Sequence, residues 1–386
     1  MSGQRCAVVR CNEPLSMVEH FGKLQDPRME RARRHELKDI IVITLCAVIC
    51  GADNWVEIEE FGKAKEEWFR TFLKLPNGIP SHDTFGRVFG LLDPEQFSAC
   101  FMAWVRSVSE LAQGEVVAID GKTLRGCHDR ANGRGPLHLV SAWAAENRMV
   151  LGQTRTDAKS NEITAIPELL RVLELRGCLV TIDAMGRQKS IARQVVRQGA
   201  DYLLAVKANQ GDLRGNIQDL FACRERAGWE GVAYSRHEQV GKDHGRLERR
   251  ECWVITGPEE LAYVDPQRQW ANLGAVAKVN YRRDAAPGSP EDTRYYICSY
   301  PAEAFTLLAA TRSHWKIENS LHWVLDVAFD EDHSRVRTGY SDQNLAVIRH
   351  LALNLLKQEP SAKVGIKAKR KKAGWDFHYL LKVLSQ

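Results

Sequence analysis

Two aspartates of this 386-residue chain each follow a short apolar run. Asp120 closes the apolar part of "VVAIDGKTLRG" (116–126), and Asp183 does the same in "CLVTIDAMG" (178–186). Each run predicts a buried strand that ends on its carboxylate. If the two strands are parallel neighbours, both carboxylates lie at the edge of the sheet where α/β proteins bind ligands. For either aspartate alone, a turn former or helix cap is the commoner interpretation.

A third acid should complete such a site. Two carboxylates held close together repel each other unless a cation lies between them, and Mg²⁺ is the usual partner of such oxygens. Glu318 lies in "LLAATRSHWKIENSLHWVLDV" (307–327), which predicts a helix, and its spacing from His314 and His322 places both imidazoles on its face. The group suits metal ligation or phosphate contact, although an exposed Glu–His pair is the commoner interpretation of this helix taken alone.

The elements that must position these acids change in character near residue 114. Before it, the pattern is helical, with Ser81 as an N-cap. After it, short strands alternate with helices, and a β-rich insertion follows from 225 to about 300. The pattern predicts a mixed α/β sheet covered by helices. We expect helices at 37–50, 55–73, 81–93, 94–111, 162–175, 187–198, 305–325 and 341–357, and strands at 116–120, 137–144, 149–155, 178–183, 201–206, 248–256, 274–283 and 294–300.

Composition excludes several classes of protein. The chain is 44% hydrophobic and 27% charged, as in a soluble globular protein. Its longest apolar run, 40–52, is shorter than the roughly 20 residues that a membrane span needs. The N-terminus lacks the features of a signal peptide, so we expect a cytoplasmic protein. Ten scattered cysteines without a C-x-x-C pair argue against a zinc ribbon or a disulfide framework.

Positive charge is concentrated near the C-terminus. The net charge is +5, but residues 357–386 alone hold eight basic and two acidic side chains. The run Lys369, Arg370, Lys371 and Lys372 is a short block of like charge that suits phosphate neutralisation. A second basic cluster lies at 27–39. Together they suggest nucleic acid as a partner, although a solvated tail and an exposed helix face are the plain alternatives.

Seven motifs occur in the order found in one known family. They are "SHDTFGRVF", "AIDGKTLRG", "LHLVSAW", "KSNEITAIPELL", "TIDAMGRQ", "YLLAVKANQ" and "HWKIENSLHWVLDV". With them the chain resembles the DDE transposases of bacterial insertion sequences, specifically the H-repeat-associated branch found near Rhs elements. The resemblance extends from about residue 20 to 357, and the combined motifs are far more specific than any one of them.

This resemblance implies an RNase H-like catalytic core with a β-rich insertion, preceded by a helical domain. Asp120, Asp183 and Glu318 then become the catalytic, metal-holding acids, with Mg²⁺ or Mn²⁺ as cofactor. The family often places Tyr, Arg and Lys around its Glu, where this chain has Thr311, His314 and Leu325. The implied segments are 1–113 (DNA-end binding or dimer contact), 114–224 (first part of the core), 225–302 (insertion), 303–357 (completion of the core) and 358–386 (basic tail).

The chemistry that the resemblance implies is phosphodiester cleavage and strand transfer. Two metal ions about 4 Å apart activate a water or a DNA 3′-hydroxyl and stabilise the leaving oxygen during in-line attack. The substrates are then double-stranded DNA at element ends and at the target. A DNA-bound homodimer is expected because two ends must be paired, and the DNA-bound protein is expected at the nucleoid.

Other residues are weaker candidates for DNA contact. Lys122 and Arg125 follow Asp120 and could bind phosphate, although exposed basic side chains are common. The next strand ends at Lys207, Asn209 and Gln210, which could line the same edge or form a polar loop. His314 and His322 also belong to this predicted set. Trp253 and Trp270 could stack on an unpaired base, but core packing is the better interpretation of each.

Two rival functions remain open. The first is an inactive or repurposed relative that binds DNA without cutting it, against which the intact Asp120, Asp183 and Glu318 argue. The second is an unrelated enzyme with paired acids, such as a glycoside hydrolase. The basic C-terminal segment and the lack of an aromatic-rich sugar cleft argue against it.

Overall fold

The computed structural model describes residues 16–128, 135–156, 162–183, 188–207, 210–243, 246–284 and 291–386. It divides into two compact units. The helical unit consists of Met1–Val108, Arg125–Gly135 and Val324–Gln386, and the sheet unit consists of Ser109–Leu124 and Pro136–Trp323. Each unit is described by itself.

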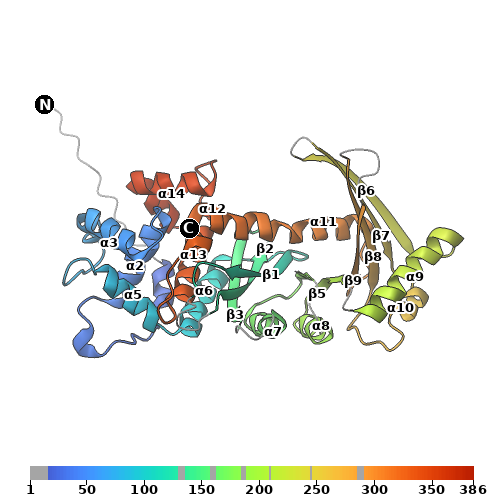
Figure 1. The fold of residues 1–386 in the computed structure, drawn as a ribbon, viewed down its shortest axis with the longest axis horizontal. Helices are drawn as coiled ribbons and strands as arrows, with labels where there is room; N and C mark the ends of the chain where they lie inside the picture. The colour runs from blue at the N-terminus through green and yellow to red at the C-terminus, as the bar shows by residue number, and fades with distance from the viewer. Residues whose placement is uncertain are drawn as a thin grey trace. The chain divides into compact units, whose positions relative to one another are not determined.

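One continuous sheet runs through the sheet unit (Figure 1), and nine of its strands lie in the described residues. Its order is β3-β2-β1-β4-β5-β9-β8-β7-β6. The first three strands form an antiparallel meander, and β4 and β5 continue parallel to β1, which gives the RNase H-like core that was expected. The strands are β1 (Val116–Leu124), β2 (Leu137–Ala144), β3 (Met149–Thr156), β4 (Leu179–Ile182), β5 (Asp201–Val206), β6 (Tyr234–Asp243), β7 (Arg246–Ile255), β8 (Ala275–Asp284) and β9 (Glu291–Cys298).

The strands of the insertion extend this sheet and do not form a second one. Antiparallel pairing of β9 with β5, in the register Leu203↔Cys298, joins them. The strands predicted at 248–256, 274–283 and 294–300 are confirmed as β7, β8 and β9. Strand β6 was missed because its sequence, "YSRHEQVGKD", has almost no apolar alternation.

Helices cover both faces of the sheet. Figure 1 shows α7 (Glu162–Val172) and α8 (Gln188–Arg197) on one face and α11 (Ala304–His314) on the other. Helix α11 contacts β1 and also β6 and β7, and it buries residues at helical spacing, Ala304, Leu307, Leu308 and Thr311. Two further helices, α9 (Gly211–Ala227) and α10 (Pro258–Val264), contact each other. In the chain, α9 precedes β6, and α10 lies between β7 and β8.

The long helix expected at 305–325 is interrupted. Helix α11 ends at His314, a π-helical turn spans Glu318–His322, and α12 (Trp323–Phe329) follows. π-Helical turns are rare and frequently occur at functional sites. This one carries a predicted catalytic acid and a predicted histidine.

Strand β1 does not end on Asp120, contrary to the sequence-based expectation. It continues to Leu124 because residues 121–124 still pair with β2. Only its parallel pairing with β4 stops, at Ile119↔Ile182. Asp120 is therefore the first residue of β1 beyond its parallel neighbour.

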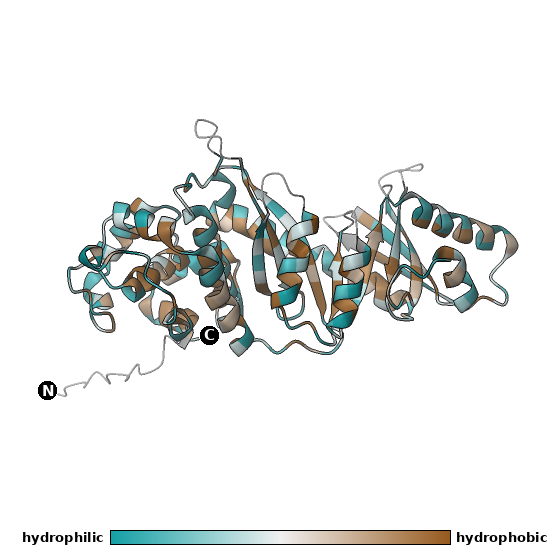
Figure 2. Ribbon diagram, turned by 90° about the horizontal axis from the view of Figure 1, so that it is seen from below, coloured by the Kyte–Doolittle hydropathy of each residue, from teal (hydrophilic) through white to brown (hydrophobic). Residues whose placement is uncertain are grey.

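The helical unit is built around α13, whose residues from 344 to 356 are all buried. Helix α13 packs against α2, α5 and α6, and Figure 2 shows apolar and polar residues alternating along the helices of this unit. No described helix of the protein is long and apolar enough to cross a membrane. The helices are α1 (Ser16–Phe21), α2 (Leu37–Ile49), α3 (Trp55–Ala64), α4 (Glu66–Phe69), α5 (His82–Leu91), α6 (Pro94–Val108), α13 (Ser341–Gln358), α14 (Ile366–Trp375) and α15 (Phe377–Leu384).

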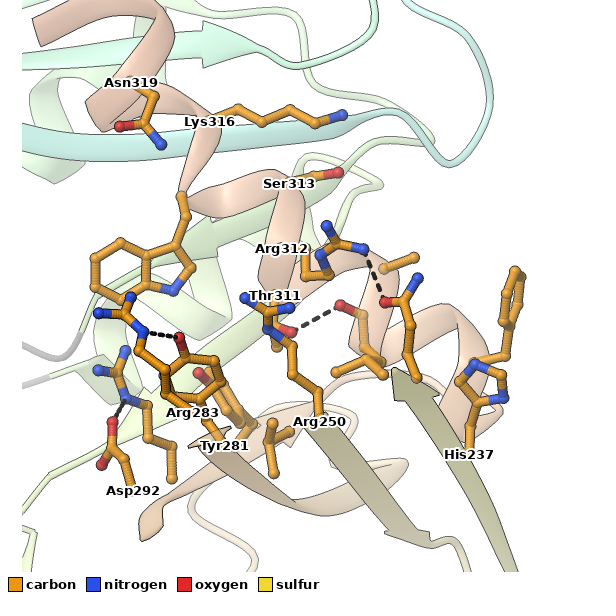
Figure 3. A pocket seen from close by; sticks show the side chains of 18 residues that line it. His237, Arg250, Tyr281, Arg283, Asp292, Thr311, Arg312, Ser313, Lys316 and Asn319 are labelled. Carbon is orange, nitrogen blue, oxygen red and sulfur yellow. Dashed lines mark hydrogen bonds and ion pairs between the residues drawn. The ribbon is translucent and has the colours of Figure 1, made fainter. Parts of the chain in front are cut away.

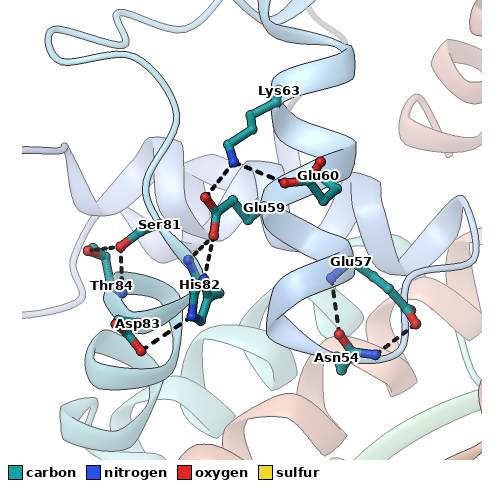
Figure 4. A network of polar contacts seen from close by, with 9 residues as sticks. All are labelled: Asn54, Glu57, Glu59, Glu60, Lys63, Ser81, His82, Asp83 and Thr84. Carbon is teal, nitrogen blue, oxygen red and sulfur yellow. Dashed lines mark hydrogen bonds and ion pairs between the residues drawn. The ribbon is translucent and has the colours of Figure 1, made fainter.

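Side-chain caps fix the starts of two of these helices (Figure 4). Asn54 Oδ1 accepts a hydrogen bond from Glu57 N at 3.0 Å, and the Glu57 carboxylate accepts one from Asn54 Nδ2 at 2.7 Å. Ser81 Oγ accepts a hydrogen bond from Thr84 N at 3.4 Å, which confirms the predicted cap. Such caps satisfy backbone N–H groups that the first turn leaves without partners.

The C-terminal segment, which the sequence analysis named a basic tail, is folded into helices. Helices α14 and α15 contact α13, and they bury Ala373, Tyr379 and Val383. An apolar face at helical spacing provides the driving force for this packing.

Candidate active site

The two predicted aspartates lie side by side at one edge of the sheet. Strands β1 and β4 are parallel neighbours in the register Ile119↔Ile182, so Asp120 and Asp183 occupy equivalent positions one residue further along. The prediction that both carboxylates emerge at the same edge is confirmed.

Glu318 and His322 reach the same place from the π-helical turn. His322 Nδ1 lies 3.2 Å from Glu318 Oε2 and 3.5 Å from Asp120 Oδ2. One ligand atom from each of the three residues lies within 4.8 Å of the others, which is close enough to share a metal ion. His322 is buried, and its Nε2 has no hydrogen-bond partner in the described part of the chain.

Asp183 stands slightly apart from this close group. Its Oδ2 accepts a hydrogen bond from Lys207 Nζ at 3.0 Å, and both side chains are about half exposed. Lys207 thus lines the predicted edge, where it pairs with an acid. The negative charge of Asp183 also acts on Asp120.

His314 does not flank Glu318, unlike His322. Its Nδ1 forms a 2.9 Å hydrogen bond with Thr181 Oγ1 on β4. Burial lowers the pKa of His314, and the negative charges of Asp120 and Asp183 partly offset that effect. It is therefore anchored to β4 and lies within electrostatic range of both aspartates.

Electrostatics at Asp120 favour the arrival of a cation. Burial raises its pKa most, the neighbouring His322 and His314 lower it, and Asp183 raises it again. Carboxylate oxygens, with one imidazole available, are ligands that Mg²⁺ and Mn²⁺ accept. The residues present thus fit a divalent metal.

Comparison with known proteins identifies the family. The model of the transposase DDE domain matches residues 111–355, and that of the DDE_Tnp_1-associated domain matches residues 18–105. The chain belongs to the DDE transposase family. It is 42% identical over 96% of its length to "Putative transposase YncI" of Escherichia coli O157:H7, covering 94% of that protein.

The H-repeat-associated branch is confirmed by a second relative of this transposase. "H repeat-associated putative transposase YhhI" of Escherichia coli K12 is 40% identical over 96% of this chain and 97% of its own length. Among solved structures, the piggyBac transposase synaptic complex with hairpin DNA aligns with 92% of this chain and 74% of its own at 11% identity, with a TM-score of 0.41.

Glu162 is a further acid near this candidate site that the sequence analysis did not single out. It opens α7, its carboxylate lies directly over Gly121, and the charges of Asp120 and Asp183 act on it. The signal was present in the motif "KSNEITAIPELL", but no spacing rule links residue 162 to residue 120.

The remaining loop candidates are distributed as follows. Lys122 Nζ donates to the backbone oxygen of His322 at 3.4 Å, so it points toward the π-helical turn. Arg125 is exposed and belongs to the helical unit. Gln210 precedes α9 and lines a separate cavity of about 530 Å³. Asn209 lies outside the described residues.

Neither predicted tryptophan faces the acidic edge. Trp253 stacks on Trp229 with ring centroids 4.9 Å apart, and the Arg236 guanidinium lies 4.5 Å above its ring. Its neighbours Cys252 and Val254 face α11, so Trp253 is on the opposite face of the sheet. Trp270 is 6% exposed, which fits the packing interpretation.

The C-terminal basic run divides into buried and accessible residues. Lys369 donates to the backbone oxygen of Leu356, and Arg370 donates to Val48 O and Asp53 Oδ1. Both are buried and satisfied within the chain, which corrects the expectation that they contact DNA as part of a free tail. Lys371 is exposed, and Lys372 lies over the Tyr379 ring.

A large basic groove lies between α11 and the insertion strands (Figure 3). Its volume is about 810 Å³. The sequence signal was an alternation on β8 and β9 that puts Tyr281 and Arg283, then Arg294 and Tyr296, on one face. The groove is lined by five basic side chains, Arg250, Arg283, Arg294, Arg312 and Lys316, and by the aromatic rings of His237, Tyr281, Tyr296, Phe305 and Trp315.

Proposed function

We propose that this chain cleaves DNA strands at insertion-sequence ends and joins the freed ends to target DNA by in-line attack on phosphodiesters. Asp120, Asp183 and Glu318 hold divalent metal, Mg²⁺ or Mn²⁺, for both steps. One observation carries the proposal: Asp120, Glu318 and His322 converge within 4.8 Å, beside Asp183, in a member of the DDE family.

Each residue of the site has a separate role. Bound divalent metal supplies Lewis-acid activation of the attacking oxygen and charge stabilisation of the leaving oxygen. His322 lies between Asp120 and Glu318 and keeps the two carboxylates oriented toward each other. Lys207 orients Asp183. Lys122 approaches the π-helical turn that carries Glu318.

We further propose that the groove takes an unpaired DNA strand next to the cleaved bond. Its volume falls within the roughly 300–1,000 Å³ of pockets for small ligands, which suits a few nucleotides and not a duplex. Phe305 and Trp315 are 65% and 48% exposed, as stacking on unpaired bases requires.

The groove also approaches the acids. A smaller pocket lined by Asp183 and His314 shares Arg294, Tyr296, Thr311 and Trp315 with it. A strand held in the groove is therefore directed toward the carboxylates.

The other assignments follow from family membership. We propose DNA-end recognition or dimer contact for 1–113, a catalytic core in 114–224 and 303–357, and DNA contact by the insertion 225–302. We propose further that the protein pairs two ends as a DNA-bound homodimer at the nucleoid. In the segment 358–386, the exposed Lys371 remains a candidate for phosphate contact.

A nicking assay on supercoiled plasmid tests the proposal. Wild-type protein should nick in Mg²⁺ and not in EDTA, and Asp183→Asn should bind DNA without nicking it. Metal-independent nicking would overturn the proposed chemistry. DNA binding without nicking by both proteins would instead identify an inactive relative.

A further inference from the structure

We propose that Glu162 is a fourth carboxylate of the metal site and that Gly121 is the residue that allows it to reach there. This inference rests on the proposed function. It assigns a role to a side chain outside the Asp120, Asp183 and Glu318 set.

The approach of Glu162 to β1 is unusually close. A Cβ atom on Gly121 would overlap Glu162 Oε1 and lie 2.9 Å from Oε2. Any side chain at residue 121 therefore displaces the carboxylate. Gly121 directly follows Asp120 in the strand, and the charges of Asp120 and Asp183 both act on Glu162, so its carboxylate lies within electrostatic range of the acidic edge.

The surroundings of Glu162 are unfavourable for an anion. The side chain is half-buried. Burial and the negative charges of Asp120 and Asp183 raise its pKa, and the charge of Lys207 only partly compensates. A half-buried carboxylate among like charges is stabilised when a cation joins the group.

A simpler role would be to stabilise the N-terminus of α7. Acids in the first turn of a helix stabilise it through the helix dipole. That role predicts a less stable Glu162→Gln variant with unchanged metal affinity. A ligand role predicts that metal-free Glu162→Gln is at least as stable as wild type, since a repulsive charge is removed, and that it binds metal more weakly.

The test is a Mn²⁺ titration of the full-length protein followed by electron paramagnetic resonance, with thermal unfolding in EDTA alongside. Glu162→Gln should weaken Mn²⁺ binding by at least about 10-fold, the lower end of what loss of a supporting residue costs a metal site. Glu168→Gln is the matched control, because Glu168 is exposed on the same helix. Gly121→Ala should weaken binding in the same direction while it keeps every carboxylate.

The outcomes separate this inference from the proposed function. If Asp183→Asn loses nicking but Glu162→Gln binds Mn²⁺ like wild type, the fourth-ligand role fails and the transposase chemistry stands. If Asp183→Asn still nicks in a metal-dependent manner, the proposed function fails. If Glu162→Gln is less stable in EDTA and keeps its Mn²⁺ affinity, the helix-dipole role is the correct one.

Discussion

The two units differ in how their buried charged side chains are paired. In the helical unit, Arg370 is 3% exposed and donates to Val48 O, Ala52 O and Asp53 Oδ1. In the sheet unit, Asp120 is near two other acids, Asp183 and Glu162, that repel it. A charge whose partners all belong to its own chain has a structural role. A group of like charges that is not balanced within the chain favours the binding of an ion of opposite charge.

Two carboxyl groups show the same contrast through their pKa values. Burial alone would raise the pKa of Glu359, but hydrogen bonds from the backbone N–H groups of Ser361 and Ala362 help to hold it at about 2. Burial and Asp183 raise the pKa of Asp120, and nearby imidazoles offset only part of that. The folded chain thus stabilises one carboxylate and destabilises the other.

Removing the buried cation should have the largest effect. Arg370→Met should lower the free energy of unfolding by about 3–5 kcal/mol, because it leaves Asp53 and several buried carbonyl groups without their partner. Urea denaturation measures this loss. Lys371→Met, the exposed neighbouring position, should stay within about 0.5 kcal/mol of wild type. Equal stability of both variants would show that Arg370 is not structural.

Removing an acid of the sheet unit should impair activity and spare the fold. Asp120→Asn should reduce plasmid nicking by more than about 100-fold, since even residues that only support metal ligands cost about 10–100-fold. Its unfolding temperature in EDTA should equal or exceed that of wild type, because a repelling charge is lost. A lower unfolding temperature would mean that Asp120 is held by interactions within the chain.

The response to pH should have opposite signs in the two units. The pKa of Glu359 is depressed, so the stability it contributes is present above its ordinary value of 4.5 and is lost as the pH falls toward about 2. The pKa of Asp120 is raised, so metal-free β1 should become more stable as the pH falls from neutrality toward that pKa.

Hydrogen exchange of residues 116–124 and 345–356 at several pH values measures the two responses. Glu359→Gln should remove the acid sensitivity of the second segment. Protection that changes in the same direction in both segments would contradict the comparison.

Single charges in the groove should have the smallest effect. Lys316→Gln should weaken binding of a single-stranded oligonucleotide. It should also make the slope of log binding constant against log salt concentration less steep by about 0.7, the value expected for one phosphate contact on a single strand. Arg236→Gln is the matched control, because Arg236 lies over Trp253 on the other face. Fluorescence anisotropy at several salt concentrations distinguishes them, and equal slopes would exclude the groove as the path of the strand.

The parts of the fold and of the candidate site that depend on local sequence pattern could be predicted from the sequence. The two repeated apolar runs located Asp120 and Asp183, and the four-residue spacing located His322 beside Glu318. The burial of Arg370 depends on Val48, 322 residues away in the chain, so the charged run looked like a solvated tail. Glu162 was missed for the same reason, because its approach to Gly121 arises only from the packing of α7 on the sheet.

Strand β6 and the basic groove could not be recognised from amino-acid composition. Strand β6 lacks an apolar face, and the basic residues of the groove are spread over several strands and α11. No single window of sequence contains enough of them to form a recognisable patch.

The pairing of β9 with β5 also has a consequence for truncated forms of the protein. A chain that stops before residue 291 lacks β9, and it leaves β5 as an unpaired edge strand with the apolar sequence "DYLLAV". Exposed apolar edges of this kind promote aggregation. Such a fragment lacks Glu318 as well, so truncation within the insertion removes a proposed catalytic acid and exposes an aggregation-prone edge together.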